Sequence, residues 1–356
     1  MNIKKIRFEN FRSYTDIRVD FEKGINFIYG DNASGKTNLV EGIYYFAFAR
    51  SFRTKDDCLL KKNGETATYL RTIYNRYGYE NKIEISLPPI GKRILINDKK
   101  ISKVSELSKQ LNIIYFIPND VNLLKASPKD RRNYLDMVIS KVDNSYLDLI
   151  VEYNKVLKER NALLKNTDID LNLLDIIDEK YIDLNYKIYK FRLEFVRKIN
   201  NVLPEIFNKL FLKDVKAHLI YKSFVKNYKT KDELGLYIKS QHDVDIKFKI
   251  SVSGIQKDDF SLFINDKDVG KYGSQGENRL STICLKMVNY FLSDDDNKPI
   301  VIMDDVLSEL DKEHEDSLIE FLKTLEQVFI TSTKKYEING VHYYYIKNSN
   351  ITKEVN

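Results

Sequence analysis

A glycine-rich stretch near the N-terminus has the residue types and spacing of a phosphate-binding loop. It follows the pattern Gly-x-x-x-x-Gly-Lys-Thr, with Gly30, Gly35, Lys36 and Thr37 at the fixed positions. Glycines let backbone N–H groups face phosphate oxygens, and a helix that follows presents its positive end. In such loops the lysine reaches the β- and γ-phosphates and the threonine hydroxyl binds Mg²⁺. We therefore predict a nucleotide site in which Lys36 is catalytic and Thr37 is a metal ligand. The loop residues predicted to bind the nucleotide are Gly30, Asp31, Asn32, Ala33, Ser34, Gly35, Lys36, Thr37 and Asn38.

Two adjacent aspartates end an apolar run far along the chain. Residues 300–303 read Ile-Val-Ile-Met and are followed by Asp304 and Asp305. A buried strand that ends in acids forms the second half of many phosphate-loop sites, because a carboxylate holds Mg²⁺ and its water. A strand followed by a helix cap looks similar when taken alone, but its pairing with the loop favours a nucleotide site. We predict that Asp304 is a Mg²⁺ ligand and that Asp305 is catalytic, orienting or deprotonating the attacking water.

The residues around these acids resemble those of ABC-type ATPases. Residues 306–311, Val-Leu-Ser-Glu-Leu-Asp, are similar to the loop that follows the acids in that class, and residues 272–279, Tyr-Gly-Ser-Gln-Gly-Glu-Asn-Arg, stand where its signature loop lies. A serine-capped helix is the simpler interpretation of residues 272–279 taken alone. The resemblance implies instead a second phosphate cradle, which faces the γ-phosphate held by another subunit and makes ATP join a dimer. The signature residues predicted to bind ATP are Ser274, Gln275, Gly276 and Glu277.

The same resemblance raises the question of which residue senses the nucleotide. ABC transporters place a γ-phosphate-sensing histidine after the strand that corresponds to residues 327–333, whereas this chain has Thr331 and no histidine before His342. At the position where ABC heads have a glutamine that contacts the metal site, this chain has Asn119 and Asp120. The sequence leaves open whether Thr331 or Asp120 takes the sensing role.

The elements that must position these residues follow from the hydrophobic pattern. An apolar run at residues 25–29 predicts a buried strand before the loop, and apolar residues on one face of 39–47 predict a helix after it. Residues 127–130, Ser-Pro-Lys-Asp, begin a helix, and the pattern stays helical to about residue 211. Further strands are expected at residues 3–8 and 17–21, at three places within 66–98, and at 113–117, 217–221 and 246–252, with alternating helices and strands from about residue 274.

These elements predict an α/β protein with a helical insertion. Together with the ABC resemblance they indicate a P-loop ATPase domain of ABC type, similar to the heads of Rad50 and SMC proteins, with a mostly helical inserted domain. The expected boundaries are 1–120 and 245–356 for the two sequence halves of the ATPase head and 121–244 for the insert.

Composition excludes several other classes of protein. The chain is 43% hydrophobic and 31% charged, which is an ordinary globular composition. No run reaches the ~18 apolar residues of a membrane span, and the N-terminus lacks an apolar signal core. We therefore expect a cytoplasmic protein without a membrane partner. The net charge of +6 permits a nucleic-acid partner but does not require one.

Over nearly its whole length the chain resembles the RecF family, which is related to SMC and Rad50 heads. The short helical insert, in place of a coiled-coil arm of hundreds of residues, favours RecF over SMC and Rad50. The stretches that carry the resemblance are IKKIRFENFRSY (3–14), GDNASGKTNLVEGIYYFAFARSFRT (30–54), SPKDRRNYLD (127–136), YNKVLKERNALL (153–164), YGSQGENR (272–279) and IVIMDDVLSELD (300–311).

The resemblance implies an ATP-dependent DNA-binding protein of recombinational repair and replication restart. Proteins of this family form ATP-induced homodimers on linear or gapped DNA, which presents double-stranded and single-stranded segments at gaps or junctions. With RecR and RecO they promote RecA loading in gap repair and in the SOS response to damage. The implied cofactors are ATP and Mg²⁺, and slow ATP hydrolysis, stimulated by DNA, acts as a release step.

Some residues depart from the family pattern and keep another class of function open. Residues 256–259, Gln-Lys-Asp-Asp, lack the histidine that usually precedes two acids there, and Glu277 stands where glutamine is common. Asp305 is shorter than the glutamate of ABC heads. This leaves a second hypothesis open, in which the protein is a nucleotide-gated protein scaffold without useful ATP hydrolysis. A transporter subunit is disfavoured because the chain lacks the glutamine loop and the sensing histidine.

Candidate DNA contacts are basic residues near two of the motifs. Arg131 and Arg132 lie in the first turns of the helix predicted after Ser127, and Arg50, Arg53 and Lys55 follow the helix after the phosphate loop. Each could meet phosphate, but a solvated surface explains each one equally well. Contacts to the DNA backbone and its shape are expected rather than base recognition.

Overall fold

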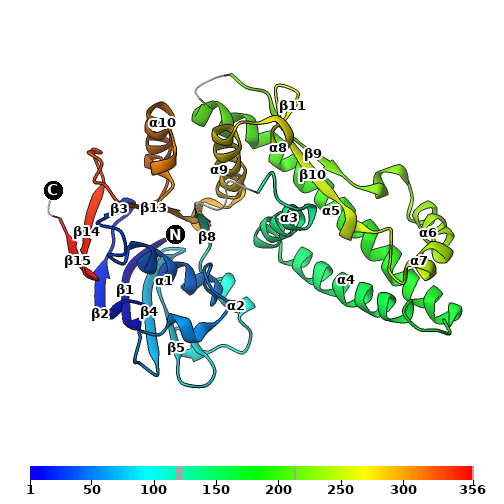
Figure 1. The fold of residues 1–356 in the computed structure, drawn as a ribbon, viewed down its shortest axis with the longest axis horizontal. Coiled ribbons are helices and arrows are strands. Elements are labelled where there is room, and N and C mark those ends of the chain that lie inside the picture. The colour runs from blue at the N-terminus through cyan, green and yellow to red at the C-terminus, as the bar shows by residue number, and fades with distance from the viewer. Residues whose placement is uncertain (118–122, 212–213, 355–356) are drawn as a thin grey trace. The chain divides into compact units, whose positions relative to one another are not determined.

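The computed structural model describes residues 1–117, 123–211 and 214–354. The chain divides into two compact units, shown in Figure 1, and each is described by itself. The sheet unit contains residues 1–120, 209–213 and 283–356, and the helical unit contains 121–208 and 214–282. The domain limits expected from the sequence place the insert at 121–244, and those limits remain a prediction.

The sheet unit is built around a largely parallel sheet with the strand order β15-β14-β3-β13-β12-β8. β13 lies between β3 and β12 and is parallel to both, so the ends of these three strands meet at the same edge of the sheet. All residues of β12 and β13 are buried, as their apolar sequences predict. The strands are β3 (Gly24–Tyr29), β8 (Ile113–Phe116), β12 (Ile300–Asp304), β13 (Gln327–Ser332), β14 (His342–Lys347) and β15 (Asn350–Lys353).

A second, antiparallel sheet in the same unit has the order β2-β1-β4-β5-β6-β7. Helix α1 (Lys36–Phe48) packs against strands of both sheets, and ten of its thirteen residues are buried. It lies so close to β1 that a Cβ at Gly42 would overlap the ring of Phe8. The phosphate loop is thus held between a buried strand and a buried helix. The strands are β1 (Asn2–Phe11), β2 (Tyr14–Asp20), β4 (Thr68–Arg76), β5 (Tyr79–Leu87), β6 (Arg93–Ile96) and β7 (Lys99–Lys100), and the shorter helices include α2 (Ser105–Ser108) and α10 (Lys312–Lys323).

The helical unit contains long helices beside a three-stranded antiparallel sheet with the order β11-β10-β9. The predicted start of α3 (Pro128–Val142) is confirmed, because the Ser127 side chain accepts a hydrogen bond from the Asp130 N–H. The other elements are α4 (Asn144–Leu163), α5 (Leu171–Phe211), α6 (Lys231–Ser240), α7 (His242–Phe248), α8 (Val269–Tyr272), α9 (Gln275–Leu292), β9 (Ala217–Lys222), β10 (Asp259–Ile264) and β11 (Lys267–Asp268). Helices α5 and α9 each end within residues assigned to the sheet unit.

The strand predicted at residues 246–252 is wrong. Helix α7 runs to Phe248 and ends at Lys249, which has a left-handed φ of 56°. Asp245 explains the difference, because its carboxylate accepts a hydrogen bond of 2.8 Å from the Val252 N–H and satisfies the backbone without a neighbouring strand. The sheet instead uses β10, whose alternating buried residues Phe260 and Leu262 carry a strand pattern that the sequence interpretation missed.

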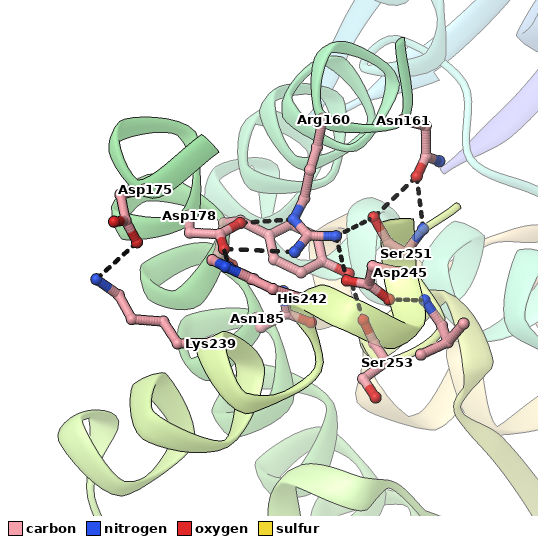
Figure 2. A network of polar contacts seen from close by, with 12 residues as sticks. Arg160, Asn161, Asp175, Asp178, Asn185, Lys239, His242, Asp245, Ser251 and Ser253 are labelled. Atoms are coloured by element: carbon pink, nitrogen blue, oxygen red, sulfur yellow. Dashed lines mark hydrogen bonds and ion pairs between the residues drawn. The ribbon is translucent and has the colours of Figure 1, made fainter. Parts of the chain in front are cut away.

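A buried network of charges holds the end of the helical unit together (Figure 2). Arg160 of α4 donates hydrogen bonds of 2.5 Å to Asp178 of α5 and 2.6 Å to Asp245 of α7. All three side chains are almost fully buried. His242 lies 2.6 Å from the other oxygen of Asp178, and Ser251 accepts a further bond from Arg160. One arginine of the RecF-like stretch at residues 153–164 therefore joins three helices.

None of the helices within the described ranges is both long enough and apolar enough to cross a membrane.

Candidate nucleotide-binding site

The phosphate loop connects β3 to α1 and has a backbone that other residues cannot adopt easily. Gly30 and Gly35 have φ values of 154° and 119°. A Cβ at Gly30 would overlap the carbonyl oxygen of Ile346 on β14, and one at Gly35 would lie 2.9 Å from the hydroxyl of Tyr14. Buried Tyr14 donates a hydrogen bond of 2.9 Å to the Gly35 carbonyl. Tyr14 ends the stretch at residues 3–14 that carries the family resemblance, but no contact with the loop was predicted for it.

Lys36 points into the loop. Its Nζ donates hydrogen bonds of 2.7 Å to each of the carbonyl oxygens of Gly30 and Asp31, and its residue is 8% exposed. Burial lowers the pKa of Lys36, and the nearby carboxylates of Asp305 and Asp304 oppose this shift. The ammonium is thus held by neutral carbonyls beside an open pocket, where an anion would stabilise it.

Thr37 and Asp304 come together at the edge of the parallel sheet. The Thr37 hydroxyl, in the first turn of α1, donates a hydrogen bond of 3.2 Å to Oδ1 of Asp304 at the end of β12. Asp304 is 5% exposed, and burial raises its pKa although hydrogen bonds from Thr331 and Thr37 oppose the rise. A hydroxyl and a carboxylate are the hard oxygen ligands that Mg²⁺ prefers. The two residues therefore fit a Mg²⁺ ion, whose charge would compensate the buried carboxylate.

Asp305 turns the chain sharply after β12. Its φ of 52° lies in the left-handed region, and its N–H donates a hydrogen bond of 3.0 Å to the hydroxyl of Thr331. Its Oδ1 is buried and has no hydrogen-bond partner among the described residues. A buried oxygen without a partner is unusual and marks a place where a water or ligand would be stabilised.

A pocket of about 240 Å³ lies over these residues. The structure thus brings the loop and both aspartates together, while their catalytic, nucleotide-binding and metal-binding roles stay predictions. Arg53 also lines the pocket, and it donates a hydrogen bond of 3.0 Å to Asn38. The lining residues are Asn32, Ala33, Gly35, Lys36, Thr37, Asn38, Arg53, Asp304, Asp305, Thr331 and Thr333.

A buried glutamate behind the pocket was not predicted. Glu41 of α1 accepts two hydrogen bonds, of 2.9 and 2.6 Å, from Arg12, and Arg53 lies 3.6 Å from it. Its side chain is fully buried. The regular apolar spacing of α1 gave no sign of a buried ion pair, because the partner Arg12 lies on another element.

The signature residues lie in the helical unit at the start of α9. Ser274 and Glu277 form a capping box: the Ser274 hydroxyl accepts from the Glu277 N–H at 3.1 Å, and Glu277 Oε2 accepts from the Ser274 N–H at 2.8 Å. Ser274, Gln275 and Gly276 are exposed. The segment is therefore a serine-capped helix start with exposed residues, and its role as a second phosphate cradle stays a prediction.

Two of the candidate DNA contacts, Arg131 and Arg132, have hydrogen-bond partners within the protein, and DNA contact by either one stays a prediction. Arg131 donates hydrogen bonds of 2.7 and 2.6 Å to the two oxygens of Asp259, and Arg132 donates one of 2.7 Å to the Asp258 carbonyl. Asp259, the first residue of β10, and the Asp258 carbonyl just before it thus hold the start of α3, and the two arginines are half-buried rather than fully solvated. Of the other candidates, the Arg50 guanidinium lies 5.9 Å from the centre of the Phe48 ring. Asn119 and Asp120 lie outside the described residues.

The fold and the site define an ABC-type ATPase head. The family model described as "RecF/RecN/SMC N terminal domain" matches residues 2–353. An SMC head bound to the C-winged helix domain of ScpA superposes with a TM-score of 0.62 at 14% identity, over 99% of this chain and 97% of that one, which shows a shared fold.

More similar proteins specify the family within this class. The chain is 34% identical to the "DNA replication and repair protein RecF" of Clostridioides difficile (strain 630), over 94% of this chain and 92% of that protein. It is 33% identical to the RecF of Thermoanaerobacter sp. (strain X514), over 99% and 100%. A solved structure of the recombination mediator protein RecF with ATP has a TM-score of 0.87 at 30% identity, over 99% and 97%. The chain belongs to the RecF family.

Proposed function

We propose that this protein is an ATP-dependent DNA-binding protein of recombinational repair and replication restart. The observation that carries the proposal is the meeting of Lys36, Thr37 and Asp304 around one pocket. Relatives described as DNA replication and repair proteins, and a relative solved with ATP, support the same assignment.

The chain's own residues bind and orient the triphosphate. Lys36 exchanges the carbonyls of Gly30 and Asp31 for β- and γ-phosphate oxygens, and the loop N–H groups face the same oxygens. Thr37 and Asp304 would hold Mg²⁺, which supplies charge neutralisation at the phosphates. Asp305, with its buried oxygen without a partner among the described residues, orients or deprotonates a water for attack on the γ-phosphate.

ATP also joins two copies of the protein in this proposal. The exposed Ser274, Gln275 and Gly276 and the half-buried Glu277 of one copy face the γ-phosphate held by the loop of its partner. The resulting homodimer binds linear or gapped DNA, and with RecO and RecR it promotes RecA loading in the cytoplasm. Slow ATP hydrolysis, stimulated by DNA, dissolves the dimer and releases the DNA.

A second candidate function is a nucleotide-gated protein scaffold without useful hydrolysis. Asp305 favours it, because a carboxylate on a short side chain in a left-handed turn reaches less far than the glutamate of other ABC heads. Both functions require ATP binding, and they differ in turnover.

Light scattering with and without ATP, followed by addition of gapped DNA, tests the proposal. We expect a monomer without nucleotide, a dimer with ATP, and a dimer–DNA complex that weakens steeply with salt. Equally tight DNA binding without nucleotide would contradict the ATP switch. ATPase measurements with and without DNA then separate the two candidates, since the scaffold predicts no turnover in either condition.

A further inference from the structure

Thr331 is one of the residues that line the pocket, and it contacts both aspartates there. It lies on β13, the strand between the one that leads into the phosphate loop and the one that ends in Asp304. Its residue is 1% exposed. Its hydroxyl donates a hydrogen bond of 2.6 Å to Oδ1 of Asp304 and accepts one of 3.0 Å from the N–H of Asp305. One side chain therefore contacts both aspartates.

The hydrogen-bonding capacity of a hydroxyl limits what Thr331 can do. A threonine has a single O–H to donate, and here that proton is committed to Asp304. No donor remains for a γ-phosphate oxygen, whose recognition requires donors. The geometry therefore disfavours the sensing role that position 331 would have by analogy with the transporter histidine.

The same two hydrogen bonds fix the two carboxylates in different ways. The bond to Oδ1 of Asp304 holds that carboxylate from the side of β13, while Thr37 holds the same oxygen from the side of α1. The bond from the Asp305 N–H anchors a turn with a φ of 52°, which a residue with a side chain adopts at a cost. Because the turn sets the direction of the Asp305 side chain, Thr331 also determines where that carboxylate lies.

We propose that Thr331 is a positioning residue that orients Asp304 toward the Mg²⁺ ion of ATP and holds Asp305 in its left-handed turn. The proposal rests on the proposed function, because it assumes that the pocket binds ATP with Mg²⁺. Removing a group that hydrogen-bonds to a metal ligand typically lowers metal affinity or activity about 10–100-fold.

The test compares Thr331→Val, which keeps the shape and loses both hydrogen bonds, with Thr331→Ser, which keeps the hydroxyl. Binding of a fluorescent ATP analogue is measured at equilibrium in EDTA and over a series of Mg²⁺ concentrations. We expect Thr331→Val to raise the Mg²⁺ concentration for half-maximal effect about 10–100-fold, with affinity in EDTA changed less than about twofold. Thr331→Ser should recover most of the Mg²⁺ response.

Thr72→Val is the matched control for the loss of a buried hydroxyl. Thr72 lies on β4, is fully buried, and donates a hydrogen bond of 3.1 Å to the Lys5 carbonyl, away from the nucleotide pocket. Its substitution should lower the unfolding temperature without changing the Mg²⁺ response. Should Thr331→Val fail to fold, Thr331→Cys, of similar size and with a much poorer donor, takes its place with the same expected shift.

Three outcomes would overturn the proposal: an unchanged Mg²⁺ response in Thr331→Val, a serine variant as impaired as the valine variant, or an equal loss of affinity in EDTA and in Mg²⁺. The last result would show that Thr331 contacts the nucleotide itself. Failure of the unsubstituted protein to bind the analogue would instead contradict the proposed function.

Discussion

The hydroxyl of Thr37 donates a hydrogen bond of 3.2 Å to the carboxylate of Asp304, which lies 267 residues further along the chain. This contact joins the two parts of the candidate nucleotide site, because Thr37 lies in the first turn of the helix after the loop and Asp304 ends β12. The arrangement follows from strand order, since parallel strands end at one edge of the sheet.

Gly30→Ala should destabilise the protein and abolish ATP binding. An alanine would meet both a positive φ and an overlap with the Ile346 carbonyl. Gly64→Ala is the matched control, because Gly64 has a φ of 86° but no atom within 4 Å of an added Cβ. In urea unfolding we expect a cost of about 1–2 kcal/mol for the control from backbone strain, and about 1–3 kcal/mol more for Gly30→Ala from overlap. Equal costs would show that the loop relaxes away from β14.

Glu277→Gln should strengthen ATP-induced dimerisation. Glu277 places a negative charge on the Ser274 N–H, at the point where the partner's γ-phosphate is proposed to bind. Glutamine keeps the capping box and removes the charge, so stability should change by less than about 0.5 kcal/mol. Sedimentation with ATP should show a dimer several-fold tighter. Glu313→Gln, in the exposed first turn of α10, is the control. A weaker dimer in Glu277→Gln would exclude charge repulsion at this cradle.

Asp304→Asn should stabilise the nucleotide-free protein while weakening its Mg²⁺-dependent ATP binding. Burial raises the pKa of Asp304 above the ordinary 3.8, so the folded protein binds this proton more tightly than the unfolded chain does. That contribution to stability is full below pH 3.8 and is lost as the pH rises through the raised pKa. The asparagine variant should therefore unfold at a higher temperature than the parent at pH 7, with the difference shrinking toward pH 4. Mg²⁺-dependent ATP affinity should fall about tenfold or more, the size of one contact to a charged group.

A lower stability of the Asp304→Asn variant at pH 7 would contradict this prediction. If the asparagine variant were less stable than the parent at pH 7, the hydrogen bonds from Thr37 and Thr331 would outweigh the cost of burying the charge.

Arg160→Met should destabilise the helical unit strongly. It would leave Asp178 and Asp245 as buried carboxylates without their shared cation, and such losses typically cost about 3–5 kcal/mol. Lys155→Met on the same helix removes only an exposed pair with Glu159 and should cost less than about 1 kcal/mol. Hydrogen exchange of α4, α5 and α7 measures the effect within this unit. Similar exchange in the two variants would contradict a structural role for the network.

Much of the site could be predicted because its chemistry is concentrated in short segments. Lys36 and Thr37 are adjacent in a spaced glycine pattern, and Asp304 and Asp305 end an apolar strand. The start of α3 was predictable for the same reason, since Ser127 and Asp130 lie three residues apart.

Contacts between distant segments could not be predicted from such patterns. The sequence gives no sign that Arg131 pairs with Asp259, because the two residues are far apart along the chain. The strand predicted at 246–252 failed because local alternation cannot reveal that Asp245 binds Arg160 and the Val252 N–H. The double role of Thr331 likewise depends on strand order, which no single segment contains.

The most direct test of the ATP-joined dimer mixes two defective variants. Lys36→Met disables the phosphate loop and Ser274→Arg obstructs the signature surface, so sedimentation with ATP should show each variant alone as a monomer. A dimer of one Lys36→Met copy with one Ser274→Arg copy retains one intact site. In that site the Ser274→Arg copy supplies the phosphate loop and the Lys36→Met copy supplies the signature surface. The account predicts that mixing the variants restores ATP-dependent dimers. Dimers of either variant alone at the level of the parent, or a mixture that stays monomeric, would contradict it.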